Sequence, residues 1–154
     1  MVSLHLEYTF HVWSPFRVGD ISRLEKVQKR ATKIPNILKN IDYLDRLEAL
    51  HLTTLEKRRT RGDLIYMFKI VKGIDHIDLR RSLDFNDSKT RGHEYRFSRE
   101  NFSAKRANEY SRFVTIRHNF FLNRIASLWN SLPSQVVSAQ SLNSFKARID
   151  KFLK

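Results

Sequence analysis

The sequence predicts a mainly α protein: a small helical domain of about five to seven helices, with a short β-hairpin near residues 93–116. Apolar residues recur at spacings of three and four along most of the 154-residue chain, which is the period of an amphipathic helix. Four glycines and three prolines are too few for a loop-dominated chain, and a hydrophobic fraction of 41% is enough for a core. A chain of this length is expected to form one compact domain.

The first third of the chain predicts two helices that both end at a proline. Residues 1–13 place Leu4, Tyr8 and Val12 on one stripe, and Pro15 stops that helix. The second helix is expected to begin with Asp20 as its N-cap and to end before Pro35. The residues expected to face inward on this second helix follow the helical period: Ile21, Leu24, Val27, Ala31 and Ile34.

The next two helices are predicted from their caps. Asp42 is expected to cap a short helix whose inward residues are Leu44, Leu47 and Leu50. A longer helix is expected to start at Thr53 or Thr54 and to end near Lys72, with Gly73 at the C′ position. This long helix is basic in its first half and apolar in its second half.

Residues 85–112 lack a sustained helical stripe and contain many turn residues, so we interpret them as irregular. Short strands at 93–97 and 112–116 would form the hairpin. The chain therefore divides into a helical segment at 1–84, an irregular basic connector at 85–116 and a C-terminal helical pair at 117–154, all within one domain.

The C-terminal helical pair carries the clearest pattern. The expected inward residues of its first helix, which Pro133 ends, are Phe121, Ile125, Leu128, Trp129 and Leu132. Ser141 is expected to cap the last helix, whose stripe is Leu142, Phe145, Ile149 and Phe152. Trp129 could either anchor a core or stack on a nucleic-acid base, and its place on the stripe favours the core.

The formal net charge of +13 and the sequence pI of 10.3 favour a polyanionic partner. Nucleic acid is the first candidate, and an anionic membrane surface is the second. Two basic helix faces, at 23–33 and 57–61, suit contacts with phosphates. The candidate nucleic-acid-binding residues are Arg23, Lys26, Lys29, Arg30, Lys33, Lys57, Arg58, Arg59 and Arg61.

Five aromatic residues lie among arginines in the irregular segment: Tyr95, Phe97, Phe102, Tyr110 and Phe113. They could stack on unpaired bases or pack beneath a long loop. Packing is the favoured interpretation, because buried aromatic residues are far commoner than exposed stacking platforms.

Enzymatic chemistry is not expected. The chain has no cysteine, its six histidines never form an i, i+4 pair, and it contains no HExxH, GxxxxGK, GxGxxG or GxSxG motif. We therefore expect no cofactor, no metal and no small-molecule substrate. No stretch approaches ~18 uninterrupted apolar residues, so no membrane span is expected. The expected location is intracellular and nuclear.

Three stretches resemble one family when they are taken in order. They are "HLEYTFHVWSPF…DISRLEKVQKRATKI", "RLEALHLTTLEKRRTRGDLIYMFKIVKGI" and "TRGHEYRF…FFLNRIASLWNSLPSQVVSAQSLNSFKARIDKFL". Together they are similar to the C-terminal region, thumb and post-polymerase, of reverse transcriptases from non-LTR retrotransposons of the jockey-like and chicken-repeat-like group. The resemblance implies that residues 1–84 are thumb-like and grip template RNA or an RNA–DNA hybrid.

The chain departs from this family in one decisive respect. The family's polymerase holds its magnesium ions with a Phe/Tyr-x-Asp-Asp motif, and this chain contains no Asp-Asp dipeptide. The resemblance therefore implies a non-catalytic remnant, and Met1 inside a thumb helix suggests a truncated element copy. The alternatives are a helical protein-interaction scaffold and a degenerate retroelement fragment with no selected function.

Overall fold

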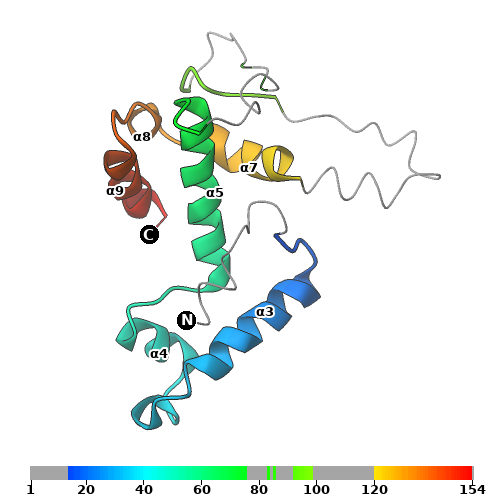
Figure 1. Cartoon of the computed structure of the whole chain (residues 1–154), viewed down its shortest axis with the longest axis vertical. Helices are drawn as coiled ribbons and strands as arrows, with labels where there is room; N and C mark the ends of the chain where they lie inside the picture. The colour runs from blue at the N-terminus through cyan, green and yellow to red at the C-terminus, as the bar shows by residue number, and fades with distance from the viewer. Residues whose placement is uncertain (1–13, 76–82, 84, 86–91, 99–119, 154) are drawn as a thin grey trace, which may run out of the picture. The chain divides into compact units, whose positions relative to one another are not determined.

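The computed structural model describes residues 14–75, 83, 85, 92–98 and 120–153 (Figure 1). In these residues the chain forms six α-helices and one 3-10 helix, η1, and no strand. The mainly α fold class is confirmed. The elements are α3 (Val18–Ala31), η1 (Asn36–Leu38), α4 (Tyr43–Ala49), α5 (Leu55–Val71), α7 (Phe121–Asn130), α8 (Ser134–Val137) and α9 (Leu142–Phe152).

The chain divides into two compact units, unit 1 at residues 1–60 and unit 2 at residues 61–154. The division falls inside α5. The predicted helix at 1–13 and the predicted strand at 112–116 lie outside the described residues. Residues 84, 116 and 117, at which the predicted segments begin or end, lie outside them as well. Within the described part, Phe97 forms an isolated antiparallel bridge with Phe85.

Helix α3 of unit 1 begins earlier than predicted. Arg17 is its N-cap residue, and its carbonyl accepts hydrogen bonds from the backbone N–H groups of Asp20 and Ile21, both at 3.0 Å. Asp20 therefore lies in the first turn, and its prediction as the cap is wrong. Its negative charge still suits this position, because the N-terminus of a helix is the positive end of the helix dipole.

The inward face of α3 is partly polar, which corrects part of the predicted apolar stripe, whose members Ile21, Leu24 and Ala31 are half-buried. Gln28 and Thr32 are buried, whereas Val27 is exposed and Ile34, just beyond the helix, is 76% exposed. The reason is that the Gln28 amide donates hydrogen bonds to the Tyr43 hydroxyl (3.1 Å) and the Thr53 carbonyl (3.0 Å). Satisfied polar groups thus occupy the interior of unit 1.

Helix α4 starts as predicted, and the Asp42 carboxylate accepts a hydrogen bond from the Leu44 N–H at 3.2 Å. Its packing differs from the prediction, because Leu47 is buried but Leu44 is exposed. The inward position beside Leu47 is taken by Arg46, which is 2% exposed.

Unit 2 contains the hydrophobic core. The second half of α5 packs against α7, α8 and α9, which Figure 1 shows around it, and the rings of Phe68 and Phe145 stack at 4.2 Å between centroids. Trp129 is fully buried there, as the stripe predicts. Gly73, with φ of 66°, ends α5: its N–H bonds the Ile70 carbonyl and the Ile74 N–H bonds the Lys69 carbonyl.

Residues 92–98 are attached to the end of α7 by side-chain hydrogen bonds. The Trp129 indole N–H donates to the Tyr95 carbonyl at 2.8 Å, and the Asn130 amide exchanges two hydrogen bonds with the backbone of Phe97. Phe97 is buried and Tyr95 packs against the core. These two aromatic residues therefore follow the packing interpretation; Phe102, Tyr110 and Phe113 lie outside the described residues.

Candidate nucleic-acid interface

The outer face of α3 presents a row of exposed cations. Arg23, Lys26 and Arg30 are spaced by three and four residues, so they share one side of α3. Lys29 adjoins them, and Lys33 continues the row from the turn just after the helix. All five are exposed. The nearest carboxylate to Arg23 is that of Asp20 at 3.6 Å, and the Arg23 side chain is still 83% exposed. An exposed pair of this kind contributes little stability, so phosphate oxygens can replace it.

A polar network behind α3 holds this row in place. The Glu25 carboxylate accepts hydrogen bonds from the Tyr43 hydroxyl and from the Leu55 N–H, the latter at 3.1 Å. Gln28 bonds Tyr43 on one side and accepts from the Arg58 guanidinium on the other. Hydrogen bonds between side chains thereby connect α3, α4 and the start of α5. These bonds fix the position of α3 and of the cations on its outer face.

Tyr43 is the member of this network whose pKa is clearly shifted. Burial, together with the hydrogen bond that its hydroxyl donates to Glu25, raises the pKa of Tyr43 to about 12. Tyr43 therefore remains a hydroxyl donor at neutral pH. Its ring also lies beneath Lys29, whose Nζ is 5.5 Å from the ring centroid, which helps to position that cation.

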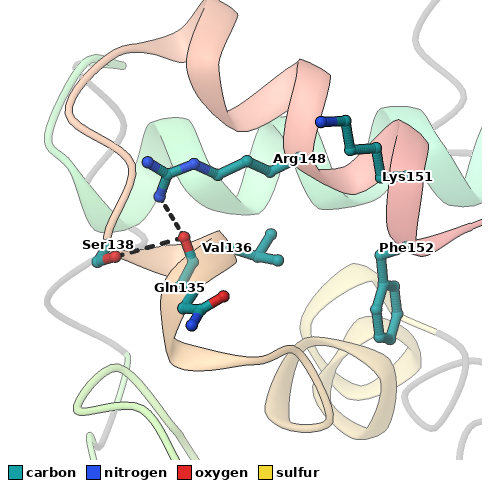
Figure 2. Close-up of a pocket in the computed structure, with 6 residues that line it drawn as sticks. All are labelled: Gln135, Val136, Ser138, Arg148, Lys151 and Phe152. Atoms are coloured by element: carbon teal, nitrogen blue, oxygen red, sulfur yellow. Dashed lines mark hydrogen bonds between the residues drawn. The ribbon is translucent and has the colours of Figure 1, made fainter.

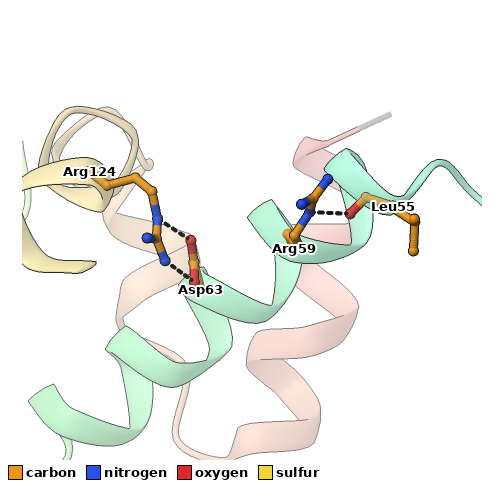
Figure 3. A network of polar contacts seen from close by, with 4 residues as sticks. All are labelled: Leu55, Arg59, Asp63 and Arg124. Carbon is orange, nitrogen blue, oxygen red and sulfur yellow. Dashed lines mark hydrogen bonds and ion pairs between the residues drawn. The ribbon is translucent and has the colours of Figure 1, made fainter. Parts of the chain in front are cut away.

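Most of the basic residues in the first half of α5 form hydrogen bonds or ion pairs with other groups of the protein. Arg58 is half-buried and donates to Gln28, and Arg59 is 5% exposed and donates to the Leu55 carbonyl at 3.2 Å (Figure 3). Arg61 makes a bidentate ion pair with Asp150 at 2.5 and 2.9 Å. Of the four α5 candidates, Lys57 is the one that stands exposed.

This burial corrects the prediction that residues 57–61 form one phosphate-binding face. Arg59 is 5% exposed and its guanidinium bonds the Leu55 carbonyl of its own helix, so Arg59 does not belong to the exposed candidate interface. The interaction with Asp150 raises the pKa of Arg61, since the carboxylate accepts hydrogen bonds from the charged form. Arg58 and Arg61 serve first as structural cations of unit 1 and unit 2, respectively.

A second ion pair inside unit 2 has the same structural character. The Arg124 guanidinium on α7 donates to both carboxylate oxygens of Asp63 on α5, at 2.9 and 3.0 Å (Figure 3). Asp63 is buried. The charges of unit 2 near α5 are therefore used to join helices.

Unit 1 also contains a pocket of about 410 Å³ beside the basic row. Its lining residues are Lys29, Lys33, Lys39, Asn40, Ile41, Asp42, Tyr43 and Arg46. Lys39 and Arg46 were not among the sequence candidates. Lys39 reaches the pocket because η1 folds the chain back after α3, and a sequence pattern does not show such a reversal. Arg46 lies on α4, four residues after the N-cap residue Asp42. The leucine pattern of this helix predicted core packing and gave no sign of a binding residue.

Unit 2 has a pocket of about 590 Å³ between α8 and α9. Figure 2 shows its lining residues, Gln135, Val136, Ser138, Arg148, Lys151 and Phe152. The Arg148 guanidinium and the Ser138 hydroxyl both donate to the Gln135 carbonyl, so the polar groups of this pocket bond one another. Phe152 is 40% exposed at this pocket, which corrects its predicted inward position. It lies in the last turn of α9, at the edge of the core.

The described residues contain no group of three histidine or acidic side chains that could hold a metal ion. Within the described part of the chain, no helix is long and apolar enough to span a membrane.

No family model, no curated protein and no solved structure matches this chain. The candidate interface is accordingly defined by its own charges, exposure and hydrogen bonds. The resemblance of the quoted segments to non-LTR reverse transcriptases stays a prediction.

Proposed function

We propose that this chain is a non-catalytic C-terminal remnant of a retroelement RNA-directed DNA polymerase, and that unit 1 binds template RNA or an RNA–DNA hybrid through backbone phosphates. One observation carries the binding proposal: the five exposed cations of the α3 row (Arg23, Lys26, Lys29, Arg30 and Lys33). The attribution to a retroelement rests on the ordered resemblance of the quoted segments. The proposal assigns no catalytic residue.

The dimensions of the α3 row suit one strand of nucleic acid. Arg23 and Lys33 are ten residues apart, so the row is roughly 15 Å long at 1.5 Å per residue. Phosphates follow one another every ~3.4 Å along one strand of a duplex, so a row of this length faces about four of them. Because the row is braced by the Glu25–Tyr43–Gln28 network, little ordering of the helix is needed on binding.

Recognition by base stacking is not part of this proposal. Trp129 and Phe97 are buried in unit 2, and Tyr95 packs against the same core. Contacts with backbone phosphates alone carry no information about base sequence. We therefore expect similar affinities for single strands of different base composition, and a strong dependence on salt.

The test is fluorescence anisotropy with a labelled oligouridylate and a labelled RNA–DNA hybrid, titrated at several KCl concentrations. Lys26→Ala is expected to reduce the slope of log K against log[KCl] by about 0.7 on the single strand, the effect of one lost phosphate contact. Lys151→Ala is the matched control, because Lys151 is exposed on α9 in unit 2. Absence of binding at low salt by folded wild-type protein would exclude the proposal, as would equal slopes for the Lys26→Ala and wild-type proteins.

A protein-interaction scaffold is the second candidate, and one observation favours it. Several large apolar side chains of unit 1 are exposed, among them Val18, Ile34, Ile37 and Leu44. Apolar surface of this kind often marks a protein contact. Leu44→Lys would weaken binding to a protein partner, whereas the RNA affinity should rise slightly or stay unchanged because the added charge is positive.

A further inference from the structure

The pocket of unit 1 contains a buried arginine whose hydrogen bonding is incomplete. The Arg46 Nε donates to the Thr32 hydroxyl at 3.2 Å, and its Nη1 donates to the Ile41 carbonyl. Its Nη2 is buried and has no hydrogen-bond partner among the described residues. Arg46 as a whole is 2% exposed, and it lines the pocket.

The charge of Arg46 is compensated only in part: its guanidinium lies 5.7 Å from the centroid of the Tyr43 ring and interacts electrostatically with the exposed Asp42 carboxylate. Both of its hydrogen-bond acceptors, the Thr32 hydroxyl and the Ile41 carbonyl, are neutral, and Arg46 forms no ion pair within the described part of the chain. A buried charge of this kind is costly unless an opposite charge lies beside it. Asp42 is the one carboxylate that lines the pocket, and it accepts the capping hydrogen bond from Leu44.

The remaining lining residues add positive charge around Arg46. Lys29 comes from α3, Lys33 from the turn after it, and Lys39 from the end of η1. Three lysines from separate positions of the chain therefore line one pocket. Four cations and one carboxylate give a net charge of 4 − 1 = +3. A planar guanidinium and several ammonium groups are the donors that proteins use for phosphate.

From these observations we propose that this pocket, which we call the Arg46 pocket and define by Lys29, Lys33, Lys39 and Arg46, binds a single phosphate group. The lysines contact its outer oxygens, and Nη2 of Arg46 is the donor left for an inner oxygen. The pocket opens beside the α3 row, so the natural source of the phosphate is a nucleic-acid backbone. The identity of this source rests on the proposed function, whereas the presence of a phosphate site does not.

The first experiment measures binding of inorganic phosphate to the full chain by isothermal titration calorimetry, at constant ionic strength with chloride as the balancing anion. Lys39→Ala is expected to weaken phosphate binding about tenfold, because one charge-assisted contact is lost. Arg46→Gln is expected to weaken it by more than tenfold. Lys151→Ala is the matched control: Lys151 is exposed on α9 in unit 2 and does not line the Arg46 pocket, so phosphate affinity should stay at the wild-type value.

The outcome at Lys39 decides the proposal even where Arg46→Gln fails to fold, because Lys39 is exposed and lies outside the α-helices. Wild-type phosphate affinity in Lys39→Ala would overturn the proposal. If Arg46→Gln gives a native circular dichroism spectrum and retains wild-type phosphate affinity, the proposal is overturned as well.

A competition arm separates the two sources of phosphate. If the pocket holds a backbone phosphate, inorganic phosphate should displace oligouridylate more effectively than chloride at equal ionic strength, and Lys39→Ala should abolish the difference. If phosphate binds in the pocket but does not compete with RNA, the site stands and its ligand is a free phosphate. If RNA binding depends on Lys26 while neither pocket variant changes phosphate affinity, the pocket proposal fails and the proposed function remains.

Discussion

The two units of this protein are stabilised in different ways. Unit 2 buries aromatic and aliphatic side chains, with Trp129, Phe145 and Phe68 at the centre of its core. In the described part of unit 1 the buried hydrophobic residues are Leu47 and Leu55, and much of the interior is polar or charged: Gln28, Thr32, Arg46 and Arg59. Unit 2 therefore depends on the hydrophobic effect, whereas unit 1 depends on hydrogen bonds and charge.

This contrast has a functional meaning under the proposed function. Two arginines of unit 2 are paired with carboxylates, Arg61 on α5 with Asp150 and Arg124 on α7 with Asp63. The cations of α3 in unit 1 remain exposed beside a pocket that carries excess positive charge. We infer that unit 2 supplies stability and unit 1 supplies the contact with nucleic acid.

The largest expected effect is in the core of unit 2. Trp129→Ala should lower the free energy of unfolding by ~3–5 kcal/mol, because it removes a fully buried indole and leaves a cavity. Urea denaturation followed by circular dichroism measures this change. Phe152→Ala is the control, and it should cost much less because Phe152 is partly exposed. A Trp129→Ala protein of normal stability that had lost RNA binding would assign the indole to the interface instead.

The two ion pairs of unit 2 should differ in their contribution to stability. Arg124→Met removes a bidentate pair from the buried Asp63 and should cost about 2–3 kcal/mol. Arg61→Met breaks an exposed pair with Asp150 and should cost about 0–1 kcal/mol. Denaturation midpoints of both variants test this order. The reverse order would mean that burial does not determine the strength of these pairs.

The polar network of unit 1 should give a smaller effect that is confined to that unit. Tyr43→Phe removes the hydroxyl that donates to Glu25 and accepts from Gln28, and it should cost about 1 kcal/mol. Hydrogen exchange of α3 amides should accelerate, while amides in α7 and α9 keep wild-type rates. Uniform acceleration throughout the chain would show that the two units do not respond independently.

The smallest effect is a pH dependence located in unit 2. Burial lowers the pKa of His93 below its usual 6.5, although the Nε2 proton is donated to the Trp129 carbonyl at 2.9 Å. Because the unfolded chain then binds the proton more readily, the stability that neutral His93 contributes is complete above pH 6.5 and is lost as the pH falls through the lowered pKa.

Thermal unfolding between pH 5 and pH 8 measures this effect at constant ionic strength. His93→Gln keeps an N–H donor for the Trp129 carbonyl but does not titrate, so its stability should change less with pH in this range. An equal slope in both proteins would assign the pH dependence to other groups.

The sequence predicted unit 2 better than unit 1, and the reason is physical. The stripe through Trp129 and the caps at Ser141 and Gly73 depend on local spacing and local chemistry, and the structure confirms them. In unit 1 the local cap at Asp42 is confirmed as well. In α3 the apolar rule failed because Gln28 finds its partners on α4 and near α5, far along the chain. A periodicity rule assigns such a residue to the surface.

The candidate site was predicted only in part for the same reason. The exposure of Lys26 and Arg30 follows from the helical period, so these members of the α3 row could be found from the sequence. The partner of Arg61 is Asp150, which lies 89 residues away. The Arg46 pocket depends on the chain reversal at η1. Neither of these long-range arrangements is visible in local spacing.

The most direct test of the account is the salt dependence of RNA binding by wild-type protein and by a variant with alanine at Arg23, Lys26, Lys29, Arg30 and Lys33. Anisotropy with a labelled oligouridylate gives log K against log[KCl] for both. At about −0.7 per phosphate contact, about four contacts predict a slope of about −3 for the wild type and a much shallower slope for the variant. A variant that remains folded and keeps the wild-type slope would contradict the assignment of the α3 row to nucleic-acid binding.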